Sequence, residues 1–132
     1  MKYIEKLRNS GLRPTKQRLQ ICEILFETKK TFHFTINDLA IKIKDQTKNK
    51  ISLATIYNTV HAFEKKGYLK QIPINSSQTY FDTNTTEHHH FYDLKEEKLI
   101  DLENCDVGPI NIKKKIDGKK IKSVEVLVKL GD

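Results

Sequence analysis

The stretch ISLATIYNTVHAFEKKGYL, residues 51–69, has the pattern of an amphipathic helix that starts at Ser52 as its N-cap and stops at Gly67. At 100° per residue, one arc of this helix is apolar and is expected to face a core: Leu53, Ile56, Val60 and Phe63. The opposite arc carries small, hydrogen-bonding and cationic side chains and no acid: Ala54, Asn58, His61 and Lys65, with Tyr57 at its edge. Such an outer face predicts a recognition helix, because the major groove of duplex DNA is wide enough for one helix.

The segments around this helix predict a winged-helix domain. Residues 2–10 read as a short helix that ends at Gly11. A second helix follows the N-cap Thr15 and has an apolar stripe of Leu19, Cys22, Leu25 and Phe26. A third opens with Thr35 and Asp38 in a capping-box arrangement, with the stripe Ile36, Leu39, Ala40 and Ile43. After the recognition helix, YLKQIPI and QTYFD read as two strands joined by the turn NSSQ.

The composition changes after residue 83. HHFYDL, KLIDL and KSVEVLVKL read as strands, while Gly108 and Pro109 interrupt residues 104–120 and leave the fold of that stretch open. The fold class is therefore α+β, with an N-terminal winged-helix DNA-binding domain over residues 1–83 and a small α/β dimerisation domain over residues 84–132. The long apolar strand from Val124 to Leu130 would be a hazard on an open sheet edge, so we expect a homodimer. Two recognition helices in one dimer could read a palindrome.

The charge is distributed unevenly along the chain. Residues 1–83 carry 15 Lys+Arg against 7 Asp+Glu, and residues 84–132 carry 9 against 10. A basic first part indicates a polyanion-binding module, although a solvated lysine-rich surface is the plainer alternative. No apolar run approaches the roughly 20 residues that span a bilayer, and the N-terminus lacks a signal-type apolar core. Two cysteines do not make a disulfide framework, so we expect a cytoplasmic protein without membrane contact.

Three separated blocks resemble the ferric uptake regulator family of metal-sensing transcription factors: GLRPTKQRLQICEIL, SLATIYNTVHAFEKKGYL and TYFDTNTTEHHHFY. Within that family, HHHF and LATIYNT are most similar to the iron response regulator branch. The resemblance implies a dimeric, sequence-specific regulator, mainly a repressor, that responds to iron status and binds an AT-rich operator. It implies a minor-groove contact for Arg13, a phosphate contact for Arg18 and base contacts near Tyr57 and Asn58. The whole predicted DNA-binding set is Arg13, Arg18, Ser52, Ala54, Thr55, Tyr57, Asn58 and His61.

The stretch EHHHFYD, residues 87–93, holds three of the five histidines. On a strand, His88 and His90 share one face and His89 points to the other, so the pair forms a natural half of a metal site. Carboxylate partners would favour iron or manganese. The resemblance supplies a hinge site drawn from both domains, made of His33, Asp82, His88, His90 and Asp101. It implies Fe²⁺ or Mn²⁺ in the cell and Zn²⁺ in vitro, with metal binding selecting one relative orientation of the domains and thereby tuning operator affinity.

The same resemblance bears on two other cofactors. The iron response regulator branch senses haem, which implies a haem site at His88, His89 and His90 and a haem-supplying protein as a partner. Many family members hold a structural zinc with two Cys-x-x-Cys pairs. Here Asp93 and Glu96 occupy the positions of the first pair and no second pair exists, so a structural zinc bound by four cysteines is excluded.

Two competing functions fit the sequence less well. A small metalloenzyme would need an open metal position and a base or nucleophile, and the chain has no His-Glu-x-x-His helix, nucleophile elbow or phosphate-binding glycine loop. We therefore predict that the chain is not an enzyme. The alternative is a non-sensing winged-helix module that binds nucleic acid or another protein through the same basic face.

Overall fold

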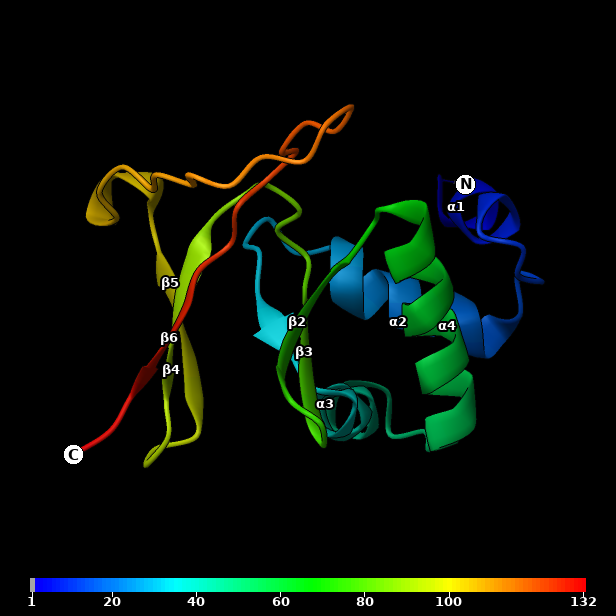
Figure 1. Cartoon of the computed structure of the whole chain (residues 1–132). Helices are drawn as coiled ribbons and strands as arrows, with labels where there is room; N and C mark the ends of the chain where they lie inside the picture. Colours follow the sequence, from blue (N-terminus) through cyan, green and yellow to red (C-terminus); the bar gives the residue numbers. More distant parts are fainter. Residues whose placement is uncertain (1) are drawn as a thin grey trace. The chain divides into compact units, whose positions relative to one another are not determined.

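The computed structural model describes residues 2–132 and divides into two compact units, Met1–Thr85 and Thr86–Asp132. The first unit is built of helices with a small sheet, and the second is built around a sheet alone (Figure 1). This arrangement confirms the predicted α+β class with a helical N-terminal part and a small C-terminal part. Within residues 2–132, no helix has the length and apolar character needed to cross a bilayer.

Four helices form most of the first unit: α1 (Lys2–Asn9), α2 (Lys16–Phe26), α3 (Ile36–Thr47) and α4 (Leu53–Lys66). Each of the last three begins at the predicted N-cap, where a side-chain hydroxyl accepts a backbone N–H three residues on. Thr35 and Asp38 form the full reciprocal capping box. Helix α4 ends at Gly67, whose φ of +86° is a left-handed conformation that glycine adopts without strain.

A three-stranded antiparallel sheet completes the first unit. The strands are β1 (His33–Phe34), β2 (Lys70–Asn75) and β3 (Gln78–Asp82), in the order β1-β3-β2. Strands β2 and β3 are the predicted hairpin. Strand β1 was not predicted, because two residues are too few to show an alternating pattern. Its pairing brings His33 opposite Asp82 and Phe34 opposite Phe81.

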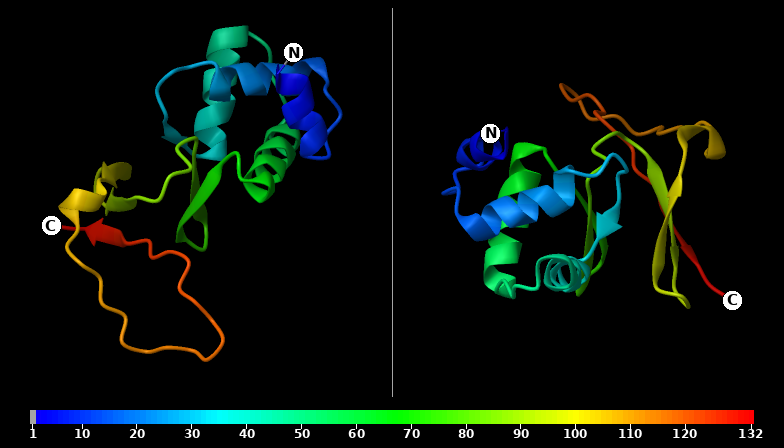
Figure 2. Two further views of the ribbon diagram at one scale, coloured as in Figure 1. Left: turned by 90° about the horizontal axis from the view of Figure 1, so that it is seen from above. Right: turned by 180° about the vertical axis from the view of Figure 1, so that it is seen from behind.

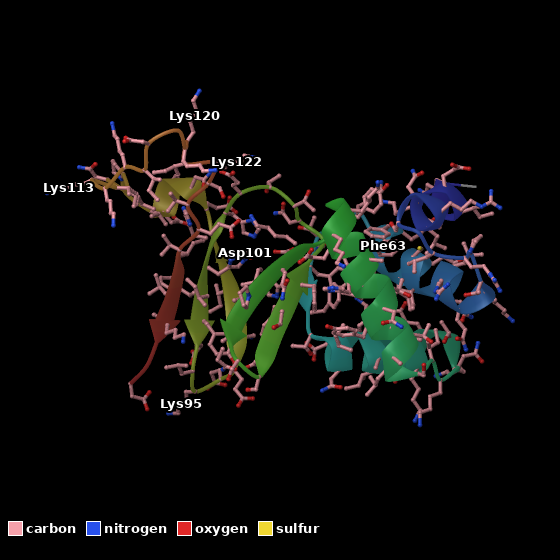
Figure 3. The ribbon with its side chains drawn as sticks, turned by 45° about the vertical axis from the view of Figure 1, so that its right-hand side comes forward. Phe63, Lys95, Asp101, Lys113, Lys120 and Lys122 are labelled. Atoms are coloured by element: carbon pink, nitrogen blue, oxygen red, sulfur yellow. The ribbon has the colours of Figure 1, made fainter. Side chains whose placement is uncertain are left out.

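Helix α4 packs its apolar arc into the core of the first unit. Ile56, Val60 and Phe63 are fully buried, and the Phe63 ring meets Phe26 edge-on at a centroid distance of 5.6 Å. Phe63 is labelled on α4 in Figure 3. The prediction that Leu53 faces this core is wrong, since its side chain is 54% exposed. Leu53 is the first residue of the helix and lies at the margin of the apolar arc. Thr59 takes the buried place instead, and its hydroxyl donates to the Thr55 carbonyl at 2.8 Å.

The second unit contains β4 (His89–Asp93), β5 (Lys98–Leu102) and β6 (Leu127–Leu130), in the order β5-β4-β6. Strand β5 runs antiparallel to β4, and β6 runs parallel to it. Strand β6 is shorter than predicted, because its partner β4 has only five residues and offers no further strand residue before His89. Between β5 and β6 the described chain forms one 3-10 turn, η1 (Asn104–Asp106), and then a long irregular connection (Figure 2).

Candidate metal centre and nucleic-acid interface

Three potential metal donors converge on one side of the sheet in the second unit. His90 on β4 is the cross-strand partner of Asp101 on β5, and His88 directly precedes β4. The Asp101 Oδ1 atom lies 3.2 Å from Nε2 of His90 and 3.5 Å from Nε2 of His88. The two imidazole rings are 4.4 Å apart, and both histidines are buried. The side chain of Asp101, labelled in Figure 3, is 44% exposed.

The tautomer of His88 is set by a backbone contact. Its Nδ1 lies 2.8 Å from the carbonyl oxygen of Thr86, an atom that can only accept a hydrogen bond. The Nδ1 atom of His88 must therefore carry the proton. In a neutral ring, Nε2 is then unprotonated and directs its lone pair towards the Asp101 carboxylate. Two electron-rich atoms face each other in this way only when a proton or a cation lies between them.

These separations fit a common metal ion. Two donors bound at about 2.0–2.2 Å, at angles between tetrahedral and octahedral values, lie roughly 3.0–3.5 Å apart. The observed distances of 3.2 and 3.5 Å fall in this range. A backbone carbonyl that accepts the second N–H of a histidine is also the usual outer support of an imidazole ligand. The three residues therefore suit a cation with mixed nitrogen and oxygen ligands.

The other two predicted ligands lie in the first unit. His33 on β1 and Asp82 on β3 are direct cross-strand partners, so their side chains project from the same face of that sheet. Asp82 is buried, and its Oδ1 accepts a hydrogen bond from the backbone N–H of Asn84 at 2.8 Å. The His33 ring meets Tyr80 edge-on at 6.0 Å. The first unit thus presents one imidazole and one carboxylate side by side.

His89 has a different position from its two neighbours. Its Nδ1 accepts a hydrogen bond from the backbone N–H of Val126 at 2.9 Å, just before β6. That bond requires Nδ1 to be unprotonated, so the neutral ring carries its proton on Nε2 and has no free lone pair for a metal or haem iron. The ring instead helps to attach the chain entering β6 to β4. No sequence pattern predicts this contact, because it joins residues 37 positions apart.

The outer face of α4 carries four of the eight predicted DNA-binding residues: Ala54, Tyr57, Asn58 and His61. Ala54, Asn58 and Lys65 are exposed, and Tyr57 is 51% exposed. The Tyr57 ring stacks on the half-buried His61 ring with a centroid distance of 5.6 Å and an interplanar angle of 11°. Stacking limits the freedom of both rings, so they form a pre-ordered pair on the helix surface. Ser52 and Thr55 lie at the N-terminus of α4, where their hydroxyls are hydrogen-bonded to each other. The other two predicted residues, Arg13 and Arg18, lie outside this helix.

Two shallow hollows line the exposed side of the first unit. One has a volume of about 620 Å³ and is lined by Arg13, Thr15, Lys16, Gln17, Arg18 and Thr55. The other has a volume of about 290 Å³ and is lined by Asn9, Ser10, Asn58, His61, Ala62, Lys65 and Lys66. Among the described residues, neither lining includes a carboxylate. Such cationic, acid-free hollows beside a helix suit phosphate groups.

Arg13 and Arg18 are held together at the first hollow. A guanidinium N–H of Arg18 donates to the Arg13 carbonyl at 3.0 Å. The Nε atom of Arg18 is buried without a hydrogen-bond partner in the described residues, so this cation is only partly satisfied by the protein. Lys16 and Gln17 also line this hollow and were not predicted as DNA-binding residues. Their position in the first turn of α2, beside two predicted cations, was the available signal.

The cysteines take no part in either site. Cys22 is buried in the core of the first unit, and burial raises the pKa of its thiol to about 11. Cys105 is exposed in η1. Asp93, at a position where many relatives of the resembled family carry cysteine, has a turn role here: its Oδ1 accepts the backbone N–H groups of Lys95 and Glu96 at 2.9 and 3.0 Å.

Known proteins share sequence and fold with this chain. The sequence model of the ferric uptake regulator family matches residues 9–130. The peroxide-responsive repressor PerR of Staphylococcus saprophyticus is 34% identical over 99 residues, which are 75% of this chain and 65% of that protein. The PerR of Staphylococcus aureus strain Mu50 is 32% identical over 100 residues, which are 76% of this chain and 66% of that protein. The match thus spans less than two thirds of these relatives.

Solved structures share the fold. The ferric uptake regulator of Vibrio cholerae has a TM-score of 0.71 at 19% identity, covering 96% of this chain and 97% of that one. The manganese-containing ferric uptake regulator of Pseudomonas aeruginosa has a TM-score of 0.67 at 17% identity, covering 97% and 96%. The resemblance to the iron response regulator branch stays a prediction, because these proteins carry other names. The chain therefore belongs to the ferric uptake regulator family, a family of metal-responsive transcription regulators and not of enzymes.

Proposed function

We propose that this chain is a homodimeric, DNA-binding transcription regulator, acting mainly as a repressor, whose operator affinity depends on a bound divalent cation. The observation that carries the proposal is the convergence of two imidazole Nε2 atoms on one carboxylate oxygen, with His88 held in the ligand tautomer by a backbone carbonyl. Apolar residues at these positions would stabilise the sheet at least as well as two buried histidines beside a carboxylate. The cluster therefore indicates binding and not fold stability.

We extend the site to the first unit. The proposed ligands are His33, Asp82, His88, His90 and Asp101, which together supply three nitrogen and two carboxylate donors. Mixed imidazole and carboxylate ligation suits Fe²⁺ or Mn²⁺, and Zn²⁺ would also bind in vitro. The ion supplies positive charge at the point where these electron-rich atoms meet. His33 and Asp82 support the extension because adjacent strands already hold them together.

Ligands on two units make the site a conformational switch. All five donors can be satisfied only in one relative orientation of the units, so metal binding stabilises that orientation over the others. In a dimer, that orientation determines the spacing of the two α4 helices. A coupling of about 1–3 kcal/mol would change operator affinity roughly 5- to 150-fold.

The DNA contact is proposed for the outer face of α4 and the two cationic hollows beside it. The exposed Tyr57–His61 pair and Asn58 are the candidates for base contacts, and the Arg13–Arg18 hollow is the candidate for phosphate. Base edges specify the sequence, while phosphates contribute affinity and register. We propose an AT-rich palindrome as the operator, as the family resemblance implies.

Dimer formation is supported by the sheet of the second unit. The register places Phe91 beside both Ile100 and Val128 on one face. Ile100 and Val128 are 42% and 37% exposed, so this apolar face has little cover within the described chain. Burial of such a face against a second copy would remove apolar surface from water and would also cover the sheet edges.

The test is DNA binding with and without metal, using wild type, His90→Ala and His61→Ala. An operator is first selected from a random duplex pool in the presence of Mn²⁺. We expect metal to raise wild-type operator affinity at least about fivefold. His90→Ala should lose this dependence, whereas His61→Ala should bind metal normally and lose operator affinity. If metal does not change wild-type operator affinity, the chain is a non-sensing winged-helix module, the alternative function.

The same DNA-binding assay tests whether peroxide or haem changes operator affinity. Adding peroxide to the Fe²⁺-loaded and Mn²⁺-loaded forms tests whether this chain shares the peroxide response for which the PerR repressors are named. Haem binding at His88, His89 and His90 stays a prediction. At His89, iron ligation would break the hydrogen bond to Val126, so a haemin titration should show a weaker Soret shift than an unconstrained histidine pair would produce.

A further inference from the structure

A short basic segment stands apart from the sites described above. Residues 110–122, INIKKKIDGKKIK, hold six lysines and one aspartate, a net charge of +5, and we call this segment the basic arm. The remainder of the second unit, residues 86–109 and 123–132, holds three lysines and nine acids, a net charge of −6. The near-neutral total of this unit therefore hides two strongly charged and opposite parts.

The basic arm is fully presented to solvent. Every residue from 110 to 122 is exposed, and none belongs to a helix or strand. One turn orders its middle, where the Lys119 N–H donates to the Ile116 carbonyl at 3.1 Å and Gly118 has a φ of +75°. Figure 3 shows Lys113 and Lys120 extending outward from this part of the loop. Within residues 2–132, Lys95 pairs with Asp132, but no lysine of the basic arm forms an ion pair with a carboxylate.

This charge arrangement calls for an external anion. Six like charges within ten residues repel one another, and the single carboxylate of the arm, Asp117, offsets only a small part of the repulsion. The rest of the second unit has nine acidic residues that could pair with these lysines. In the described chain, none of them forms an ion pair with the arm. The part of the connection between η1 and the attached Val126 spans residues 107–125, so at roughly 3.3 Å per extended residue the arm tip can reach at most about 30 Å from the sheet.

The composition of the arm indicates which polyanion it suits. Residues 103–126 contain no Phe, Tyr or Trp. Single-stranded nucleic acids are bound by stacking on aromatic side chains, and surface-lying membrane segments use a helical apolar face with aromatic anchors. The arm has neither feature. Lysines on flexible stems suit the phosphates of duplex DNA, which present about one negative charge per 1.7 Å and need no fixed geometry.

We infer that the basic arm is a second DNA contact, which binds the phosphate backbone of the duplex outside the segment read by α4. The inference rests on the proposed DNA-binding function and adds a surface to it. Because phosphates carry no sequence information, the arm contributes affinity and salt dependence without specificity. Each lysine that contacts a phosphate adds about 0.9 to the slope of log affinity against log salt concentration.

The test uses the full chain and two matched variants. The first is Lys113→Gln, Lys114→Gln and Lys115→Gln together, in the basic arm. The second is Lys95→Gln, Lys98→Gln and Lys129→Gln together, which removes the same charge from exposed positions elsewhere in the same unit. Affinity for the selected operator and for random duplex is measured from about 50 to 200 mM salt, the range over which phosphate contacts weaken most visibly. Circular dichroism checks that all three proteins are equally folded.

We expect the arm variant to lower the salt slope by about 2–3 and to weaken both duplexes by on the order of 10- to 100-fold at about 50 mM salt. The control variant should change the slope by less than about 0.5. Equal effects of the two variants would overturn the inference, because they would indicate general charge attraction. It would also be overturned if the arm variant bound DNA as wild type does but lost binding to anionic phosphatidylserine vesicles. Failure of wild type to bind any duplex would instead refute the proposed function.

Discussion

Asp101 offers the sharpest test of the metal centre, because one carboxylate oxygen serves both histidines. Its Oδ1 lies 3.2 Å from His90 Nε2 and 3.5 Å from His88 Nε2, so its loss removes a ligand without disturbing either ring. Structural zinc sites with four ligands bind with about 10–16 kcal/mol, or roughly 2.5–4 kcal/mol per ligand. Asp101→Ala should therefore weaken Mn²⁺ or Zn²⁺ binding about 10²- to 10³-fold. Asp101→Asn keeps an oxygen donor but loses the negative charge, so it should weaken metal binding less than Asp101→Ala does.

Metal affinity is measured by competition with a chelating dye, and metal-free stability is measured by urea denaturation. The control is Asp117→Ala, an exposed carboxylate in the turn of the basic arm. We expect Asp117→Ala to bind metal as wild type does. Metal-free stability should change by less than about 1 kcal/mol in both variants, because the Asp101 side chain is 44% exposed and Asp117 is exposed, and substitutions at exposed positions have small effects. Wild-type metal affinity in Asp101→Ala would refute the assignment of Asp101 as a metal ligand.

Three further outcomes follow from the fold. Ile56→Ala should destabilise the first unit by about 2–5 kcal/mol, and Leu53→Ala by less than about 0.5 kcal/mol, since only Ile56 is buried; equal urea midpoints would contradict this burial. Ser52→Ala should cost about 1 kcal/mol, because α4 loses its N-cap bond to the Thr55 N–H; an unchanged melting curve would dismiss the cap. Cys105 should react quickly with Ellman's reagent at about pH 8 and Cys22 only after unfolding. Burial raises the pKa of Cys22 from 9.0 to about 11, so its contribution to stability is present below about pH 9 and is lost as pH rises towards 11; rapid native labelling of both thiols would refute this.

The sequence determined the local elements of the first unit. Side-chain caps and glycine stops act over three or four residues, so Thr35, Ser52 and Gly67 marked their helix ends correctly. Helical periodicity also acts over three or four residues, so it correctly predicted which side chains lie on the outer face of α4. Periodicity was less decisive at the margin of the apolar arc, where Leu53 is exposed and Thr59 is buried. A threonine can occupy a core position once its hydroxyl bonds to the preceding turn, and residue type alone does not show this.

The tertiary structure decided how distant donors meet. Asp101 faces His90 because β4 and β5 pair in one register, and a shift by a single residue would turn its side chain to the other face of the sheet. His33 faces Asp82 through a two-residue strand that no sequence pattern marks. The unequal roles of three adjacent histidines depend on a carbonyl at Thr86 and an N–H at Val126. Residue types can thus nominate ligands, but only long-range backbone pairing selects which lone pairs point to a common centre.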